Sequence, residues 1–260
     1  MATYRRVFGG IAVSESDPFD LAAKLVGYRS SHRYRVRGRH LFEGVPVRHA
    51  QVLEVGCGRG AWAIWAALHG ASKIVGIEPD VEGSSDNSLE QFRRNIELLG
   101  LQERIEARGC TLQNLPGWEE RFDVAVMYNV INHLDEDAVV SLHKNAEAVK
   151  RYVALLKKLR LHMRANGWVL VADCGRDNFY PQLGVRSPFM PTIEWHKHQN
   201  PATWVRVFAE AGFDLFDLRW SPLQPLSRLT ANPVVQYFTC SHFVLRFRAT
   251  TKSLSAGAAF

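Results

Sequence analysis

The sequence predicts an α/β fold in which a mainly parallel sheet is covered by helices on both faces. Three observations lead to this prediction. Short apolar segments alternate with segments of helical period along most of the chain. A turn with three glycines, GCGRG, directly follows the first apolar segment. The 260 residues are 47% hydrophobic, which is enough to bury one sizeable core, so we expect a single domain.

The expected elements alternate regularly as far as residue 175. Apolar runs predict strands over 51–56, 73–80, 104–110, 122–130 and 168–175. Helical patterns predict helices over 60–70, 88–100 and, as one long region, 137–167. The first two helices end at Gly70 and Gly100, and glycine is a common helix terminator.

The pattern changes after residue 175. Residues 176–201 hold prolines and polar residues with little periodicity, so we expect a long loop, which in a compact domain is often functional. A helix over 201–213 and two strands over 214–220 and 236–249 should close the fold. We expect an N-terminal extension or lid over 1–50, the domain over 51–249 and a frayed tail over 250–260.

Composition indicates a cytoplasmic protein. No segment reaches the roughly 18 apolar residues of a membrane span, and the N-terminus has no apolar signal core. The cysteines are far apart and form no C-x-x-C pair, which favours reduced thiols over a disulfide framework or a zinc site. They are Cys57, Cys110, Cys174 and Cys240.

Positive charge is concentrated near the N-terminus of a chain whose net charge is +6. The segment YRSSHRYRVRGRH contains Arg29, Arg33, Arg35, Arg37 and Arg39. Because arginine suits bidentate capture of carboxylate or phosphate, this segment predicts a lid that faces a phosphate-bearing partner. A second basic set over 144–164 accompanies an apolar stripe at helical spacing and is interpreted as a solvated helix face.

The glycine turn is a candidate ligand site in its own right. Glycines between a strand and a helix let a ligand approach the backbone, and the helix N-terminus favours an anionic or polar group. Gly56, Gly58 and Ala61 satisfy the loose G-x-G-x-x-G/A dinucleotide pattern. From this loop alone, a nicotinamide or flavin cofactor therefore remains an alternative.

Three neighbouring features narrow the choice of cofactor. Glu54 precedes the loop and completes E-x-G-x-G-x-G, Glu78 ends the second strand, and FDVAVMYNVINHLDED includes the fourth strand. With these features the sequence resembles the class I S-adenosylmethionine-dependent methyltransferases over about residues 51–248. The resemblance implies a doubly wound, mainly parallel sheet of seven strands with an antiparallel last strand. It also implies S-adenosyl-L-methionine as cofactor and S-adenosyl-L-homocysteine as product.

The resemblance also implies which residues surround the cofactor. Glu78, 22 residues after Gly56, is placed to accept hydrogen bonds from both ribose hydroxyls, with Pro79 next to it. Glu54 is implied to order the loop or to meet the cofactor's amino group. The loop residues implied to lie against the methionine and ribose are Gly56, Cys57, Gly58 and Gly60. Tyr28 and Arg33 are expected to reach in from the lid.

The chain departs from the family pattern after its third strand. Many relatives have an aspartate there that accepts from the adenine amino group, whereas this chain has Cys110, Thr111 and Leu112. Thr111 or backbone groups are expected to replace that contact, and Leu112 to pack on the ring. Asn129 and Val130 occupy the family's position beside the methionine moiety and the transferring methyl group.

Four residues are candidates for catalysis. Loss of a proton from a hydroxyl acceptor needs a base, and histidine suits that role near neutral pH. His196 and His198 in the long loop would share a face if extended, and Asp173 ends the fifth strand. His133 is the alternative, although many relatives keep a histidine there to support the loop. No metal site is expected, because these residues and Glu194 form no recognised ligand pattern.

The predicted activity is methyl transfer to a hydroxyl of a small molecule or sugar conjugate, for which a phosphate group would suit the basic segment. The alternatives are an N-methyltransferase, a non-catalytic S-adenosylmethionine-binding regulator and an NAD-dependent oxidoreductase. Nucleic acid is not an expected substrate, because the chain has no separate binding module and no N-P-P-F/Y motif after the fourth strand.

Overall fold

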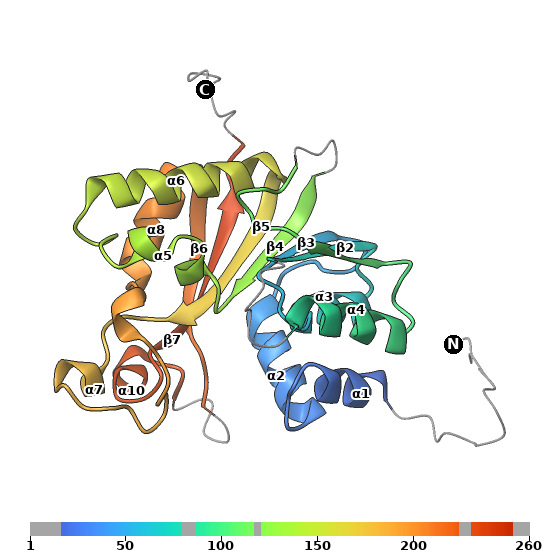
Figure 1. Ribbon diagram of the computed structural model, residues 1–260, viewed down its shortest axis with the longest axis horizontal. Coiled ribbons are helices and arrows are strands. Elements are labelled where there is room, and N and C mark those ends of the chain that lie inside the picture. Colours follow the sequence, from blue (N-terminus) through green and yellow to red (C-terminus); the bar gives the residue numbers. More distant parts are fainter. Residues whose placement is uncertain (1–16, 80–86, 117–120, 224–229, 252–260) are drawn as a thin grey trace.

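A seven-stranded sheet in the order β3-β2-β1-β4-β5-β7-β6 is the middle layer of the computed structural model (Figure 1). The structure describes residues 17–79, 87–116, 121–223 and 230–251. The strands are β1 Gln51–Val55, β2 Lys73–Glu78, β3 Ile105–Gly109, β4 Phe122–Tyr128, β5 Met163–Cys174, β6 Phe213–Trp220 and β7 His242–Ala249. Neighbouring strands from β3 to β5 are parallel, whereas β7 is antiparallel to both β5 and β6. The predicted fold, including the antiparallel last strand, is confirmed.

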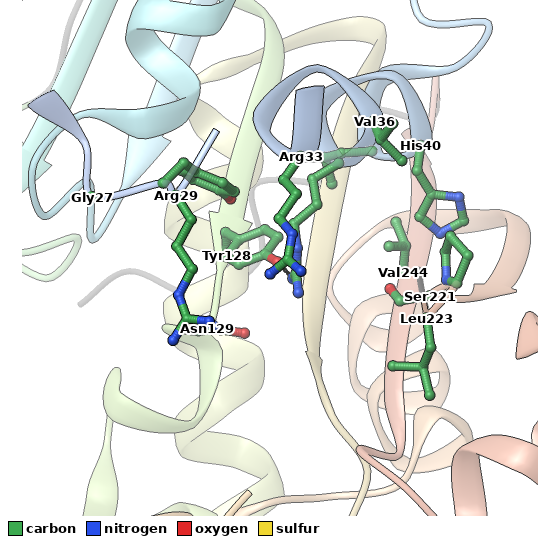
Figure 2. Close-up of a pocket in the computed structure, with 14 residues that line it drawn as sticks. Gly27, Arg29, Arg33, Val36, His40, Tyr128, Asn129, Ser221, Leu223 and Val244 are labelled. Carbon is green, nitrogen blue, oxygen red and sulfur yellow. Dashed lines mark hydrogen bonds between the residues drawn. The ribbon is translucent and has the colours of Figure 1, made fainter. Parts of the chain in front are cut away.

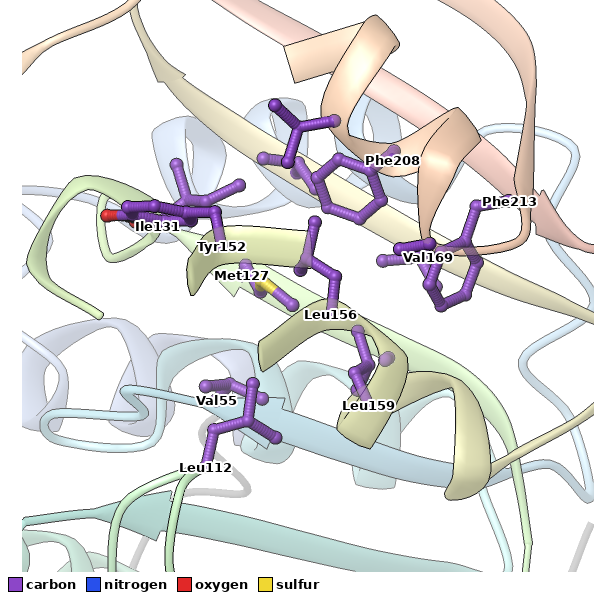
Figure 3. Close-up of a cluster of buried hydrophobic side chains, with 14 of the residues drawn as sticks. Val55, Leu112, Met127, Ile131, Tyr152, Leu156, Leu159, Val169, Phe208 and Phe213 are labelled. Carbon is purple, nitrogen blue, oxygen red and sulfur yellow. Dashed lines mark hydrogen bonds between the residues drawn. The ribbon is translucent and has the colours of Figure 1, made fainter. Parts of the chain in front are cut away.

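Helices cover both faces of this sheet. One face carries α1 Pro18–Leu25, α2 Ser31–Phe42, α3 Ala61–Leu68 and α4 Ser88–Leu98. The other carries α5 Glu136–Val139, α6 Ala146–Leu161 and α8 Pro201–Glu210. Figure 3 shows the core on this second face, where Leu156 and Leu159 of α6 and Phe208 of α8 meet Met127 and Val169 of the sheet. Alternating strand residues thus feed two separate hydrophobic cores.

The N-terminal helices are integral to the first core. Tyr34 is fully buried, and the Phe42 ring stacks on Trp65 of α3 with centroids 4.4 Å apart. Gly38 permits this close approach, since a Cβ there would lie 1.9 Å from Trp65 Nε1. Residues 17–50 therefore belong to the same domain as the sheet. Of the predicted tail, 252–260 lies outside the described residues.

Two element predictions were wrong in their extent. The helix expected over 137–167 is divided into α5 and α6, because the Asn145 side chain accepts from the Glu147 and Ala148 amides and starts a new helix. β5 then begins at Met163, opposite Phe122 of β4. The strand expected over 236–249 begins only at His242, because α10 Pro233–Tyr237 precedes it with Asn232 as its N-cap.

The segment 176–201 is mainly a loop, as predicted, with two short helical turns, α7 Phe179–Gln182 and η2 Trp195–Lys197. It packs against α10 (Figure 1), where the Phe179 and Phe238 ring centroids are 5.0 Å apart. The side-chain amide of Asn178 donates to the Thr239 carbonyl, with Nδ2 2.9 Å from the oxygen. Within the described ranges, no helix is long and apolar enough to cross a membrane.

Candidate functional site

Two cavities lie at the carboxyl ends of the parallel strands. The strand order reverses direction between β1 and β4, and ligands of open α/β sheets bind outside the strand ends at such a point. We call the first, of about 290 Å³, the glycine-loop cavity. Of the residues predicted around a cofactor, it is lined by Gly56, Gly58, Glu78, Pro79, Cys110, Thr111, Leu112, Asn129 and Val130.

Glu54, a residue of β1, stabilises the glycine loop by hydrogen bonds to the helix that follows it. Its side chain is 2% exposed, and its two carboxyl oxygens accept from the Trp62 amide at 3.2 Å and the Ala63 amide at 2.7 Å. These are amides of the first turn of α3, so Glu54 occupies the helix N-terminus. Burial raises the pKa of Glu54 to about 8, although the two amides act in the opposite direction.

This capping distinguishes the loop from a dinucleotide site. In the dinucleotide fold the pyrophosphate sits on the amides at the helix N-terminus. Here the amides of Trp62 and Ala63 are already paired with a buried side chain of the same chain. The glycine spacing satisfies the dinucleotide pattern, but Glu54 already accepts hydrogen bonds from the helix amides that would bind the pyrophosphate.

The glycines of the loop have different surroundings. Gly58 has a φ of +50° and lines the cavity, and a Cβ built on it would meet nothing within 4 Å. Gly60 has a φ of +80° and does not line the cavity, because it packs against Phe92, whose ring would lie 1.9 Å from a Cβ. Gly56 lies similarly close to the Val130 side chain. Gly58 is therefore the glycine whose missing side chain leaves open space.

The side chain of Cys57, a residue expected near the cofactor, does not line the glycine-loop cavity. The residue is 4% exposed, and burial raises the pKa of its thiol well above the ordinary range. Its surroundings are those of a packed thiol. That Cys57 lies against the cofactor stays a prediction, and it concerns the backbone rather than the thiol.

Glu78 connects the loop to the end of β2. Its Oε2 accepts from the Gly58 amide at 2.8 Å, so the acidic side chain and the open glycine are held together. Its Oε1 accepts no hydrogen bond from the described residues and is free to meet a ligand. Beyond β3, Thr111 Oγ1 accepts from the Asn114 amide at 3.2 Å, and the buried Leu112 lies near Val55 (Figure 3).

The second cavity, of about 520 Å³, lies under the N-terminal helices, and we call it the arginine cavity. It is lined on one side by Tyr28, Arg29, Arg33, Arg37 and His40, and on the other by Ser221, Pro222, Leu223 and Val244. Figure 2 shows Arg29 and Arg33 directed toward the space beside Asn129, with His40 and Leu223 farther along. Asn129 lines both cavities and marks their junction.

Asn129 is held in an unusual conformation at this junction. Its φ is +55°, in the left-handed region that few residues other than glycine and asparagine adopt. Its Oδ1 accepts from His242 Nε2 at 3.3 Å, and His242 Nδ1 accepts from the Ser221 hydroxyl at 2.7 Å. Burial lowers the pKa of His242 to about 3, with Arg37 adding to the effect. The neutral imidazole thus has one donor and one acceptor, and both are used.

The four predicted catalytic residues are not brought together. His133, in the turn η1 Ile131–His133, lines the glycine-loop cavity, and its Nδ1 is 2.8 Å from Glu136 Oε1. Asp173 and His198 are buried and pair with each other, with Asp173 Oδ1 3.0 Å from His198 Nδ1. His196 is exposed, because the turn η2 places it and His198 in different surroundings.

Of the four predicted catalytic residues, His133 alone lines one of these two cavities, and the catalytic roles stay predictions. None of Asp173, His196 and His198 lines either cavity, and no residue of 176–201 does. The arginine cavity is instead lined by residues of 27–41, which include the basic segment predicted as a lid, and by 221–223, which the sequence did not suggest. The residues that sequence reasoning missed are Arg37 as a partner of Tyr128, His40, Ser221, Leu223, His242 and Val244. Only Arg37 and His40 carried a signal, since both lie in the basic segment.

Comparisons with known proteins bear on this site. A family model described as "Methyltransferase domain" matches residues 28–218. An uncharacterized protein of Haemophilus influenzae is 28% identical over 184 residues, which are 67% of this chain and 64% of that protein, so the match spans just under two thirds of its length. A ubiquinone biosynthesis O-methyltransferase of Azorhizobium caulinodans is 24% identical over 203 residues, 74% of this chain and 71% of that protein.

Solved structures share the fold. An S-adenosylmethionine-dependent methyltransferase from Aquifex aeolicus superposes with a TM-score of 0.58 at 12% identity, covering 91% of this chain and all of that chain. An S-adenosylmethionine-dependent methyltransferase from Mesorhizobium loti superposes with a TM-score of 0.56 at 17% identity, covering 86% of this chain and 99% of that chain. At such identities the likeness concerns the fold alone.

Proposed function

We propose that this chain, which belongs to the methyltransferase domain family, uses S-adenosylmethionine as its cofactor and methylates a hydroxyl of a small molecule or sugar conjugate. The observation that carries the proposal is a pair of cavities that share Asn129 as a lining residue. The glycine-loop cavity would hold the cofactor, and the arginine cavity the acceptor. A ligand in each would bring its reacting group toward the same residue.

The residues of the glycine-loop cavity fit the cofactor. The free Oε1 of Glu78 would accept from the ribose hydroxyls, and the open space at Gly58 would admit the ligand against the backbone. Thr111 and Leu112 would lie on the adenine side. When bound, the cofactor supplies an electrophilic methyl group on a sulfonium, and Asn129 and Val130 would border it.

The residues of the second cavity would align the acceptor oxygen and remove its proton. His242 is a poor base, because its pKa of about 3 leaves it neutral and it is engaged with Asn129, so its role is to position that residue. His40 lines the arginine cavity, and burial, as the main cause, lowers its pKa. His40 is therefore an uncharged imidazole near neutral pH. We assign to it, in place of His196 and His198, the removal of the proton from the acceptor hydroxyl.

The activity can be tested without knowing the acceptor. The protein would be incubated with a metabolite extract and methyl-labelled S-adenosylmethionine, and new labelled compounds identified by mass spectrometry. Glu78→Ala serves as the disabled variant and Glu97→Ala, an exposed position on α4, as its matched control. A labelled product with the protein and the Glu97 variant, but not with the Glu78 variant, is expected.

The product also separates the alternatives. A methyl ether supports transfer to oxygen, whereas a methylated nitrogen would show an N-methyltransferase. If the protein binds S-adenosylmethionine and yields no labelled product from extracts of several sources, the proposal fails in favour of a non-catalytic binding protein. His40→Gln should lower turnover by roughly a hundredfold, the usual scale for a positioned base, at unchanged cofactor affinity.

A further inference from the structure

The arginine cavity has an unbalanced charge. Arg29, Arg33 and Arg37 line it, and none of its lining residues in the described part of the chain is an aspartate or glutamate. A cavity lined by one sign of charge raises the local concentration of ligands with the opposite sign. The lining therefore favours an anion over a neutral or cationic ligand.

Two of these three arginines have side chains without a partner among the described residues. Arg37 donates to the Tyr128 hydroxyl at 2.5 Å, and Arg35, on the same helix but outside the cavity, pairs with Asp17. By contrast, the guanidinium groups of Arg29 and Arg33 make no ion pair and no hydrogen bond with any described residue. Figure 2 shows both reaching from the N-terminal elements toward the cavity beside Asn129.

The proposed cofactor adds to this imbalance. Its sulfonium would bring a further positive charge to Asn129, next to the unpaired guanidinium groups. The cofactor's ammonium and carboxylate groups offset each other, so its net charge is positive, and a neutral acceptor would leave the cavity with an excess of positive charge. An anionic acceptor would instead neutralise this excess, and the planar guanidinium forks match carboxylate or phosphate oxygens in pairs.

We infer that the methyl acceptor carries a carboxylate or phosphate group, which Arg29 and Arg33 bind in the arginine cavity. This inference rests on the proposed function. The anionic group would lie against the two guanidinium groups, and the nucleophilic atom between Asn129 and His40, the base assigned above. Apolar side chains on the far side, Val36, Leu223 and Val244, accommodate the remaining carbon skeleton.

The test uses matched anionic and neutral probes. Binding of benzoate and benzamide, and of phenyl phosphate and phenol, is measured by calorimetry on the full chain, with and without saturating S-adenosylhomocysteine. Three proteins are compared: the wild type, the double variant Arg29→Gln/Arg33→Gln, and Arg39→Gln. Arg39 is a matched control, because it is an exposed arginine on the same helix and does not line this cavity.

In at least one pair the anion should bind about tenfold or more tightly than its neutral counterpart, the scale of hydrogen bonds to charged groups. The double variant should lose this preference and Arg39→Gln should keep it. The pair that shows the preference tells carboxylate from phosphate. Equal binding of anion and neutral probe, no binding of any probe, or a preference retained in the double variant overturns the inference.

These outcomes are distinct from failure of the proposed function. If wild type does not bind S-adenosylhomocysteine, the proposed function fails, and the acceptor role of the arginines fails with it. If S-adenosylhomocysteine binds but the anion preference is missing, only the inference about the acceptor fails. The double variant should keep its affinity for S-adenosylhomocysteine within about threefold, because neither arginine lines the glycine-loop cavity.

Discussion

Two glycines of the same loop should respond oppositely to the same small change. Replacing Gly58 with alanine adds a methyl group where nothing lies within 4 Å, inside the cavity assigned to the cofactor. Replacing Gly60 adds the same group 1.9 Å from the ring of Phe92, which is fully buried and closely packed. Gly58→Ala should therefore damage binding, and Gly60→Ala should damage folding.

The magnitudes follow from these surroundings. Both residues have positive φ, so alanine costs about 1–2 kcal/mol at either position. This is small against a domain stability of about 5–15 kcal/mol, so Gly58→Ala should stay folded. Gly60→Ala adds overpacking of about 1–3 kcal/mol, for a total loss of about 2–5 kcal/mol. The same overpacking acts on the ligand in Gly58→Ala and should weaken cofactor binding by about 5- to 150-fold.

Two assays on each variant check this reasoning. Chemical denaturation followed by circular dichroism gives the free energy of unfolding, and calorimetry gives the affinity for S-adenosylhomocysteine. Should Gly58→Ala bind the ligand as tightly as wild type, the open space at Gly58 is not part of the cofactor site. Should it unfold as readily as Gly60→Ala, Gly58 serves the turn and not the ligand.

Three further predictions concern the supporting structure. Because burial raises the pKa of Glu54 from 4.5 to about 8, the native state holds a proton that the unfolded state has lost, and the free energy of unfolding should fall as the pH rises through this window. Glu54→Gln should flatten that slope in denaturation series, and an unchanged slope would assign it to other groups. Tyr34→Ala should cost about 3–5 kcal/mol of stability, and a loss below about 1 kcal/mol would mean that the N-terminal helices are appended rather than integral. His198→Gln should lower stability by about 1–3 kcal/mol by removing the imidazole that pairs with the buried Asp173, whose Oδ1 also accepts from the Cys174 amide, whereas His196→Gln should change stability by less than about 0.5 kcal/mol and leave turnover unaltered. A large loss of turnover in His196→Gln alone would indicate that the loop 176–201 belongs to the active site.

Local sequence pattern was sufficient for most of the fold. The strands of the parallel sheet and the helices after β1 and β2 follow directly from apolar runs and glycine stops. The pattern failed where apolar residues suit two structures. The stretch before β7 has strand-like residues, but Asn232 and Pro233 start a helix there, and a capping signal outweighs a few residues of propensity.

The site was predictable only where its residues belong to one motif. Glu54, Gly58 and Glu78 lie at spacings that the resemblance assigns, and the structure places the last two at one cavity. The other cavity is assembled from segments far apart in the chain. His242 contacts Asn129 across 113 residues, and no local period indicates such a pairing. For the same reason residues 221–223 and Val244 carried no sequence signal, whereas the basic segment that lines the same cavity did.

The central claim is that the glycine-loop cavity binds S-adenosylmethionine through Glu78, and titration calorimetry tests it most directly. Wild type and Glu97→Ala should bind one S-adenosylhomocysteine per chain and show no binding of NAD. Glu78→Ala should bind S-adenosylhomocysteine weaker by about 1.5–3 kcal/mol, or about 10- to 150-fold, the range for hydrogen bonds to a charged group. Binding of NAD in place of S-adenosylhomocysteine, or an unchanged affinity in folded Glu78→Ala, would contradict the claim.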